Sequence, residues 1–477
     1  MRYNYSKGII LPSVLVFASI SVLIVGALIS WSGTQIKVTR TFSYKEQALQ
    51  IAEAGIEYYR WHLAHAPQDY TDGSTSTPPY VHVFNDKNGN RIGQYELTIT
   101  PPLLGSTLVT VESKGIVDMY PQTYRKVRAQ FAKPSIAKYA IVANADIRFG
   151  AGTEILGPVH SNGGIRFDGV AYNTVTSAKS TYVDPDTGGQ ARFGVYTQVF
   201  PVDPYPPTAV PSRLDVFKAG RQFPVAGVDF AGITSDLSAI KTSAQSGGKY
   251  LTSSGAQGYR IVFKIDDTYD VYKVTNLLSL SNTCSSNSSG GSTAGWGSWS
   301  IRTNNGQTFV GNYQNPSNGL IFVEDNIWVE GQINGARITV VAAKFPIPTT
   351  SPSITINNNL IYTNYDGTDA LALIAQGNIN IGYDSANTMR IDAALIAQNG
   401  RAGRYYYASS CGSSYIRSSV TLYGMIATSQ RYGFAYTDGT GYTTRSLVYD
   451  TNMLYAPPPS FPLTTDEYTV ISWQEIK

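Results

Sequence analysis

The chain has 477 residues, which is too long for a single compact core and predicts several domains. Its 36 Lys and Arg nearly balance its 33 Asp and Glu, and a formal net charge of +3 gives no reason to expect a nucleic-acid partner. Charged residues make up only 14% of the chain, whereas the 34 Tyr and 44 Gly are abundant, a composition typical of exposed, turn-rich β-structure.

An apolar segment opens the chain. Residues 9–29 are almost wholly apolar, and no charged residue occurs between Lys7 and Lys37, so the segment can cross a hydrocarbon layer of ~30 Å. Arg2 and Lys7 precede it, and the positive-inside tendency predicts a cytoplasmic N-terminus with the remaining chain beyond the membrane. A cleaved secretory signal is disfavoured because its apolar region is normally only about 7–15 residues long. We therefore expect a single-pass membrane anchor that contacts lipid through residues 9–30.

The helical pattern continues past the apolar segment. Apolar residues recur there with a period close to 3.6, and charged residues lie between them. The recurring apolar residues are Phe42, Leu49, Ala52, Ile56, Tyr59 and Leu63. Pro67 ends the pattern. The sequence thus predicts one helix over residues 9–66, apolar in its first half and amphipathic in its second.

The start of the chain resembles type IV prepilins and pseudopilins, with a short basic leader at residues 1–8 that ends in Gly8 and precedes the apolar helix. Residues 52–59, AEAGIEYY, resemble the amphipathic end of the PilX-type minor pilins. The resemblance implies methylation, contact with other pilin-like subunits, and cleavage after Gly8 by a prepilin peptidase, which leaves Ile9 as the new N-terminus. Major pilins carry a glutamate at the fifth position after the cut. Ser13 stands there in this chain, which favours a minor or tip subunit, or a protein that stays in the membrane.

Residues 67–133 are expected to form a small sheet. A loop rich in Asp, Gly, Ser, Thr and Pro, residues 67–80, comes first. Runs of alternating polar and apolar residues follow at 81–84, 95–100, 108–117 and 124–131. This alternation predicts a pilin-like sheet with one face on the amphipathic half of the helix. The turn near Asn88 has partial calcium-loop character, but Arg91 occupies the EF-hand glycine position, so a hairpin turn is preferred.

An internal repeat marks the C-terminal half. The sequence ALIAQ at residues 372–376 recurs 22 residues later at 394–398, and the related GMIAT stands at 424–428. Short strands at this spacing, separated by Asn and Gly turns, predict stacked coils of a parallel β-solenoid, with an open β-sandwich as the alternative. The residues expected at equivalent positions of successive coils are Leu373, Leu395 and Met425.

The predicted fold class is therefore mainly β with one long N-terminal helix, combining a pilin-like helix and small sheet with a parallel β-solenoid domain. We assign residues 134–173 and 316–477 to the solenoid. Residues 174–315, with Pro-rich segments and a Ser/Gly-rich loop, are expected to form an insertion. Residues 468–473, after a Pro-rich arm, are predicted to add a last strand that caps the solenoid.

The two cysteines of the chain, Cys284 and Cys411, lie in similar Ser-rich segments. Their spacing matches neither a zinc site nor an iron–sulfur site, so no metal and no redox cofactor is expected. Two such cysteines outside the membrane are more often paired, which predicts a disulfide, with two free thiols as the alternative.

Acidic and histidine residues give no convincing active site. A carbohydrate-active solenoid would need clustered carboxylates. The acidic residues near the repeat are Asp366, Asp369, Asp384 and Asp392. The contexts of Asp366 and Asp384 are typical of turns. His62 and His65 have a helical spacing that suits a metal, but surface histidines explain it, and His160 lacks triad partners. We expect no catalytic, cofactor-binding or metal-binding residues.

The leading functional hypothesis is a non-enzymatic, membrane-anchored minor type IV pilin or pseudopilin-like subunit that serves pilus assembly, adhesion or secretion. Tyr-rich segments at residues 405–407 and 432–442 could stack on carbohydrate or another surface, or could simply pack on strands. The alternatives are an envelope-tethered carbohydrate-active solenoid enzyme and a membrane-anchored surface protein that never enters a filament.

Overall fold

The structure, a computed structural model, confirms a mainly β fold with one long N-terminal helix. The described residues are 10–230, 232–284 and 297–476. The chain divides into two compact units. Unit 1 comprises residues 1–101, 108–132 and 467–477. Unit 2 comprises residues 102–107 and 133–466. The long loop between the fourth strand and the last strand of unit 1 therefore contains nearly all of unit 2.

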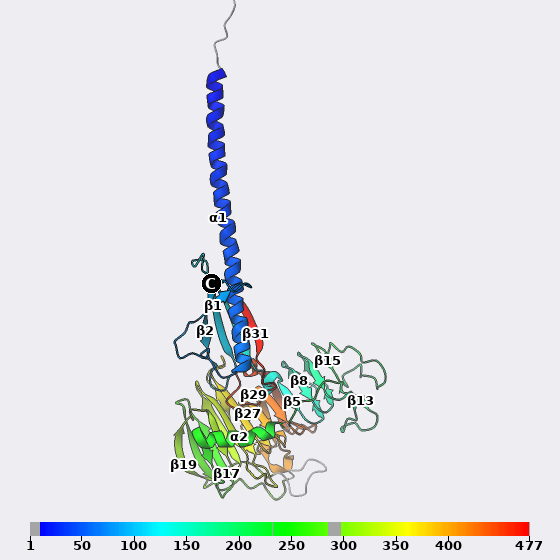
Figure 1. The fold of residues 1–477 in the computed structure, drawn as a ribbon. Helices are drawn as coiled ribbons and strands as arrows, with labels where there is room; N and C mark the ends of the chain where they lie inside the picture. Colours follow the sequence, from blue (N-terminus) through cyan, green and yellow to red (C-terminus); the bar gives the residue numbers. More distant parts are fainter. Residues whose placement is uncertain (1–9, 231, 285–296, 477) are drawn as a thin grey trace, which may run out of the picture. The chain divides into compact units, whose positions relative to one another are not determined.

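Unit 1 combines the helix α1 (Ile10–His65) with an antiparallel sheet in the order β1-β2-β3-β4-β31. The strands are β1 (Tyr80–Asn85), β2 (Arg91–Thr100), β3 (Val109–Val117), β4 (Arg125–Ala132) and β31 (Thr469–Ile476). Buried and half-buried residues alternate along β3, as the sequence pattern predicts. The sheet lies against the C-terminal half of α1 (Figure 1).

The helix and the sheet of unit 1 approach each other closely. The helix residues in the buried core are Ala48, Ile51, Ala52, Ile56, Tyr59 and Leu63. Two glycines permit the contact. A Cβ atom at Gly115 of β3 would lie 2.0 Å from the carbonyl oxygen of Ala48, and one at Gly55 would lie 2.3 Å from Ser113 Oγ. The backbones of α1 and β3 can meet at this distance only because these positions lack side chains.

Unit 2 contains a long row of parallel strands. The row runs in the order β16-β20-β22-β25-β27-β29-β5-β8-β11-β15, and each neighbouring pair is parallel. The first five are β16 (Lys249–Leu251), β20 (Leu320–Val323), β22 (Arg337–Ala342), β25 (Ala370–Ala375) and β27 (Thr388–Ala397). The others are β29 (Ile416–Thr428), β5 (Ile141–Ala143), β8 (Val159–Ser161), β11 (Val175–Ser177) and β15 (Arg221–Gln222).

The order of this row is not the order of the chain. Ile426 of β29 pairs with Ile141 of β5, so a late strand of unit 2 lies beside its earliest one. The segment 320–428 therefore forms one half of the row and the segment 141–222 forms the other. Both halves share one core of small and branched side chains, in which Leu373, Leu395 and Ile426 are almost fully buried.

Further strands complete unit 2 around this row. Parallel partners in a second row are β17 (Gly258–Phe263), β21 (Ile327–Ile333), β23 (Ile354–Thr355), β26 (Ile379–Ile381) and β28 (Ala402–Arg404). Other parallel strands are β6 (Ile147–Phe149), β7 (Glu154–Ile155), β9 (Ile165–Phe167), β10 (Val170–Ala171), β14 (Val195–Tyr196), β24 (Leu360–Tyr362) and β30 (Gly441–Tyr449). Antiparallel additions are β18 (Thr268–Val274) and β19 (Gln307–Gln314), and the pair β12 (Thr181–Tyr182) with β13 (Arg192–Phe193). Helix α2 (Gly232–Gly247) packs beside β16 and β20.

The three repeat segments are parallel neighbours, as predicted, but the register of the third is offset by one residue. Leu373 pairs with Leu395, whereas Leu395 pairs with Ile426 rather than with Met425. In this register Gly424 pairs with Ala393, and a Cβ atom at Gly424 would lie 2.1 Å from the carbonyl oxygen of Ala393. The observed register therefore requires a glycine at position 424.

Two predicted boundaries differ from the structure. Strands β11, β15, β16 and β17 belong to the parallel rows of unit 2, so residues 174–315 are not a separate insertion. Residues 468–473 do not cap the parallel row, because β31 pairs with β4 of unit 1. The edge of β4 offers unpaired backbone groups, and β31 satisfies them.

Candidate functional site

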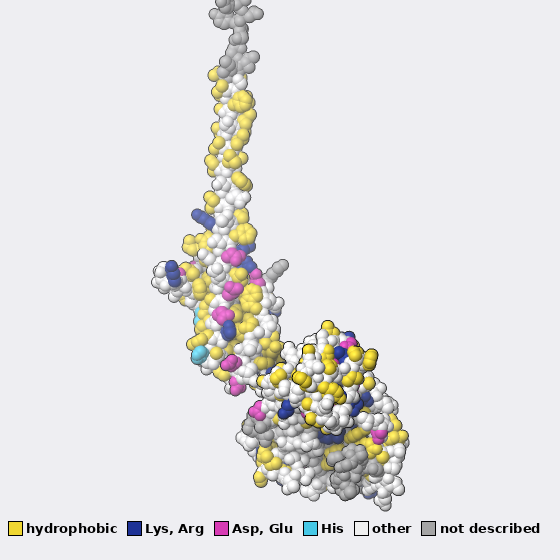
Figure 2. Space-filling model, turned by 90° about the vertical axis from the view of Figure 1, so that its right-hand side faces the viewer, with side chains coloured by type: hydrophobic (Ala, Val, Ile, Leu, Met, Phe, Trp, Pro, Cys, Tyr) yellow, Lys and Arg dark blue, Asp and Glu magenta, His cyan; other side chains and the backbone are white. Residues whose placement is uncertain are grey.

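The first half of α1 is the most distinctive surface of unit 1. Its apolar side chains contact no other part of the described chain, and Leu11, Phe17 and Leu23 are 72%, 71% and 73% exposed. The helix is long and apolar enough to cross a membrane, with a mean hydropathy of 2.5 in its most apolar window, which is nowhere buried. Figure 2 shows hydrophobic side chains along this half and charged side chains only farther down the helix. An apolar surface of this extent needs a lipid or helix partner.

The end of the apolar half has the residues expected at a membrane interface. Trp31 is 62% exposed, and Lys37 and Arg40 follow it on the helix. An aromatic residue followed by basic residues is typical of the level of the lipid headgroups. The predicted cleavage site between Gly8 and Ile9 lies outside the described residues and stays a prediction.

A disulfide in unit 2 joins Cys284 and Cys411, with the sulfur atoms 1.99 Å apart. Cys411 is buried in a cluster with Tyr405 and Tyr407. The first Tyr-rich segment therefore contributes mainly to packing around the disulfide. Its middle residue, Tyr406, instead contacts Tyr436 edge-on, with ring centroids 5.1 Å apart.

The acidic residues considered for catalysis each have a structural partner. Asp392 accepts hydrogen bonds from Tyr365 Oη at 2.6 Å and from Arg390 Nε at 2.8 Å. Asp369 accepts from backbone N–H groups, including that of Asn364 at 2.7 Å. The other two lie at the surface, where Asp384 pairs with an arginine and Asp366 closes a turn.

The histidines are likewise engaged separately. His62 Nε2 lies 3.0 Å from Asp69 Oδ2, and His65 Nδ1 lies 2.9 Å from the carbonyl oxygen of Trp61. His160 is buried, and burial lowers its pKa. Its ring nitrogens lie within hydrogen-bond distance of Thr176 and Asn162. Among the described residues, no group of three or more His, Cys, Asp or Glu side chains is arranged to hold a metal ion.

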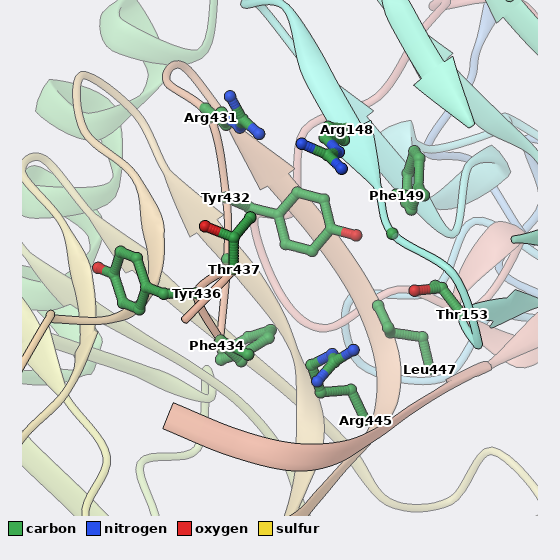
Figure 3. A pocket seen from close by; sticks show the side chains of 13 residues that line it. Arg148, Phe149, Thr153, Arg431, Tyr432, Phe434, Tyr436, Thr437, Arg445 and Leu447 are labelled. Carbon is green, nitrogen blue, oxygen red and sulfur yellow. The ribbon is translucent and has the colours of Figure 1, made fainter. Parts of the chain in front are cut away.

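A cavity of about 220 Å³ in unit 2 brings together side chains that the sequence analysis did not single out as a group. We call it the arginine pocket. Its lining side chains include Arg148, Phe149, Arg431, Tyr432, Phe434 and Arg445. Figure 3 shows Arg148 and Arg431 on one side of the Tyr432 ring and Arg445 on the other.

One sequence signal pointed toward this pocket. The tripeptide IRF occurs at residues 147–149 and again at 165–167, and the two copies pair in parallel in β6 and β9. This second repeat could have placed Arg148 opposite Arg166 on a neighbouring parallel strand. The partners of Arg148 across the pocket come from residues 431–447, far along the chain, and no local pattern links them.

The comparisons with known proteins leave the family open. No protein-family model matches the chain, and no curated protein matches it. Among solved structures, the crystal structure of the competence-associated pilin ComZ from Thermus thermophilus matches 91% of this chain and 97% of that chain. The two are 15% identical, with a TM-score of 0.30. A score this low carries no argument about fold or function, so the functional conclusion below rests on the residues of this chain.

Proposed function

We propose that the chain is a membrane-anchored, pilin-type surface subunit that presents a β-rich module outside the membrane. The observation that carries the proposal is the division of α1 into two halves. Ile51 and Ile56 in the second half are buried against the sheet of unit 1, whereas residues 11–36 carry apolar and uncharged polar side chains that are almost all exposed. One helix thus serves both as anchor and as structural support of its own domain, as the resemblance to pilins implies.

The proposed orientation places both units on the far side of the membrane from the N-terminus. The disulfide between Cys284 and Cys411 supports a location of unit 2 outside the cytosol, because disulfides persist in oxidising compartments and are rare in the cytosol. The basic residues Arg2 and Lys7 at the start of the chain support the same orientation.

We further propose that unit 2 is a β-solenoid with no catalytic role. The parallel rows, in which each strand buries its side chains against the next, support the solenoid. The hydrogen bonds and ion pairs that hold Asp369, Asp384 and Asp392 support a structural role for these carboxylates.

The proposal is tested by following the N-terminus of the protein in cells. The full chain is expressed with and without a prepilin peptidase, and the N-terminal peptide is identified by mass spectrometry. We expect Ile9 as the N-terminal residue only when the peptidase is present. A Gly8→Val variant, tested in the same cells, should remain uncleaved. Intact residues 1–8 beside complete cleavage of a reference prepilin would contradict the pilin assignment.

Membrane anchoring and entry into a filament are tested by separate measurements. The chain should stay with membranes through alkaline extraction, and a Val22→Arg variant should be released because a charge at the centre of a span is costly. A minor pilin should also occur in sheared filaments. A cleaved chain that is absent from the filament fraction would instead favour the surface protein that never polymerises.

A further inference from the structure

The arginine pocket is built by three segments of unit 2. Arg148 and Phe149 come from β6, the segment 431–437 connects β29 to β30, and Arg445 belongs to β30. An early segment with β6 and β7 meets the segment after β29 here, because β5 pairs with β29 and β7 pairs with β30.

The charge of the pocket is positive. Three arginines line it, and none of the described lining residues is Asp or Glu. Asp186 orients two of these arginines, since it accepts from both terminal nitrogens of Arg431 at 2.9 and 2.8 Å and lies 3.4 Å from Arg148 Nη1. Both guanidinium groups are thereby held at one rim of the pocket.

Arg445 differs from the other two arginines. Its Nη1 donates to the carbonyl oxygens of Tyr442 and Thr443 at 2.8 and 3.1 Å, which fixes the side chain without neutralising it. No carboxylate of the described chain forms an ion pair with it. A guanidinium held by carbonyls keeps its charge and further N–H groups for an anion.

Aromatic rings form the remaining wall. The Tyr432 ring lies 5.7 Å from the Phe149 ring and 6.3 Å from the Phe434 ring, measured between centroids. Burial raises the pKa of Tyr432, whereas Arg445 and Arg431 oppose that rise. Both cations therefore act on the hydroxyl of the same ring, in agreement with their positions around it in Figure 3. The pocket thus combines an apolar wall with three guanidinium groups, of which Arg445 has no carboxylate partner among the described residues.

We propose that the arginine pocket binds one carboxylated sugar ring of an acidic polysaccharide. Guanidinium groups pair with carboxylates through parallel N–H donors, and aromatic faces pack on the C–H face of a sugar. A cavity of about 220 Å³ is smaller than the ~300–1,000 Å³ typical of sites for larger ligands, and suits a single ring. The partly open pocket lets the rest of the polymer continue into solvent.

A nucleic acid is a poorer match for the same pocket. Strand binding without sequence preference uses an extended basic groove that follows many phosphates. Here the net charge of the chain is only +3, and two of the three arginines share Asp186. A neutral sugar is also a poorer match, because it would leave Arg445 buried against a ligand without a counter-charge.

The experiment measures binding of tetragalacturonate to the full-length protein in detergent by isothermal titration calorimetry. The matched probe is the fully methyl-esterified tetramer, which keeps the rings and lacks the charges. We expect the acid form to bind at least tenfold more tightly than the ester. Arg445→Gln should weaken binding of the acid at least tenfold, and Arg445→Lys should restore part of it. The control Arg302→Gln, at an exposed arginine outside the pocket, should bind as wild type does.

Several results would overturn the proposal. The proposal is wrong if wild-type protein binds the acid and the ester equally well, or binds neither of them. This comparison needs no variant. The proposal is also wrong if an Arg445→Gln protein, shown to be folded by its melting curve, binds the acid form with wild-type affinity. Tighter binding of a single-stranded DNA 12-mer that is lost in the same variant would assign the pocket to nucleic acid instead. Because purified protein is used, failure here leaves the anchor proposal standing, and failure of leader cleavage leaves this one standing.

Discussion

The guanidinium of Arg404 lies 5.2 Å from the ring centroid of Tyr407, and the arginine side chain is fully buried. A second ring, that of Tyr442, lies 5.7 Å away. The acceptors of its terminal N–H groups are Gly382 O, Tyr383 O, Ser385 Oγ and Ser414 O, at 2.5 to 3.0 Å. Burial lowers the pKa of Arg404, and the charge is balanced by carbonyl dipoles and ring faces rather than by a carboxylate. Arg404 thus joins the loop at residues 382–385 to the loop that follows Cys411.

Replacing Arg404 should destabilise unit 2 even when the charge is kept. Lysine in Arg404→Lys offers three donors on one nitrogen and cannot reach acceptors spread around a planar fork. We expect a loss of about 2–4 kcal/mol in the free energy of unfolding, because buried carbonyls lose their donors. Urea unfolding followed by tryptophan fluorescence measures it. Arg302→Lys, at the surface, should stay within about 0.5 kcal/mol of wild type. If Arg404→Lys has the same free energy of unfolding as wild type, the planar guanidinium group is not needed for the stability of unit 2.

The parallel row makes Leu395 sensitive to charge. Its side chain is 1% exposed and lies between Leu373 and Ile426 of the neighbouring strands. Leu395→Asp would place a carboxylate between two apolar layers without a partner, so unit 2 should fail to fold. Thr388→Asp, at an exposed position of the same strand β27, should cost little. Limited proteolysis separates the two outcomes, and equal resistance of both variants would argue against a shared core along the row.

Gly115 should be essential to the packing of α1 on β3. In Gly115→Ala the new methyl group would meet backbone atoms of Ala48 and Ala52 at 2.0 and 2.5 Å, so the helix has to move away from the sheet. We expect a destabilisation of about 1–3 kcal/mol, typical of overpacking. The control is Gly33→Ala on the exposed part of α1, where a Cβ atom meets nothing within 4 Å. Hydrogen exchange of β3 amides should rise only in the first variant.

Two aspartates of unit 2 should give opposite pH dependences. Burial raises the pKa of Asp450 above its ordinary 3.8, so the folded state prefers the protonated carboxyl. Its contribution to the free energy of unfolding therefore decreases as pH rises from about 3.8 through the folded-state pKa. Hydrogen bonds from Thr368 lower the pKa of Asp366, so its contribution is lost as pH falls below 3.8.

The corresponding asparagine variants separate the two effects. Asp450→Asn should make the slope of stability against pH more positive, because it removes a decrease with rising pH, whereas Asp366→Asn should make the slope less positive. Thermal melts between pH 3 and pH 7 measure both slopes. If both variants change the slope in the same direction, the opposite shifts assigned to these carboxyls are wrong.

The long-range order of unit 2 could not be predicted from the sequence. The helix predicted over residues 9–66 agrees with α1 (Ile10–His65), because a 3.6-residue period sustained over many turns is a strong signal. The ALIAQ repeat predicted the parallel pairing of β25 and β27, because two copies of a short sequence take equivalent positions when repeats stack. Strands such as β5 and β8 have three residues each, too few to show any period. Nothing local indicates that β5 pairs with β29 rather than with a strand close to it in sequence.

The candidate pocket depends on that same pairing, and this explains why its residues could not be grouped from the sequence. Arg148 and Arg445 lie almost 300 residues apart and meet only when the two halves of the row stack. A single arginine on a strand is usually a surface residue, so neither position carried a signal of its own. The cysteines, in contrast, could be paired because the chain has only two.

The pairing of Ala132 with Thr469 sets the order in which the sheet of unit 1 is completed during synthesis. Strand β4 ends at Ala132, and β31 is synthesised only after residues 133–466 have been added. During that interval the outer edge of β4 has unpaired N–H and C=O groups, which can form hydrogen bonds with an exposed strand of another chain. A chain whose synthesis stops between residues 133 and 466 therefore has a sheet with an open edge at β4. Until β31 pairs with β4, the sheet of unit 1 therefore stays incomplete, although its other four strands all precede residue 133.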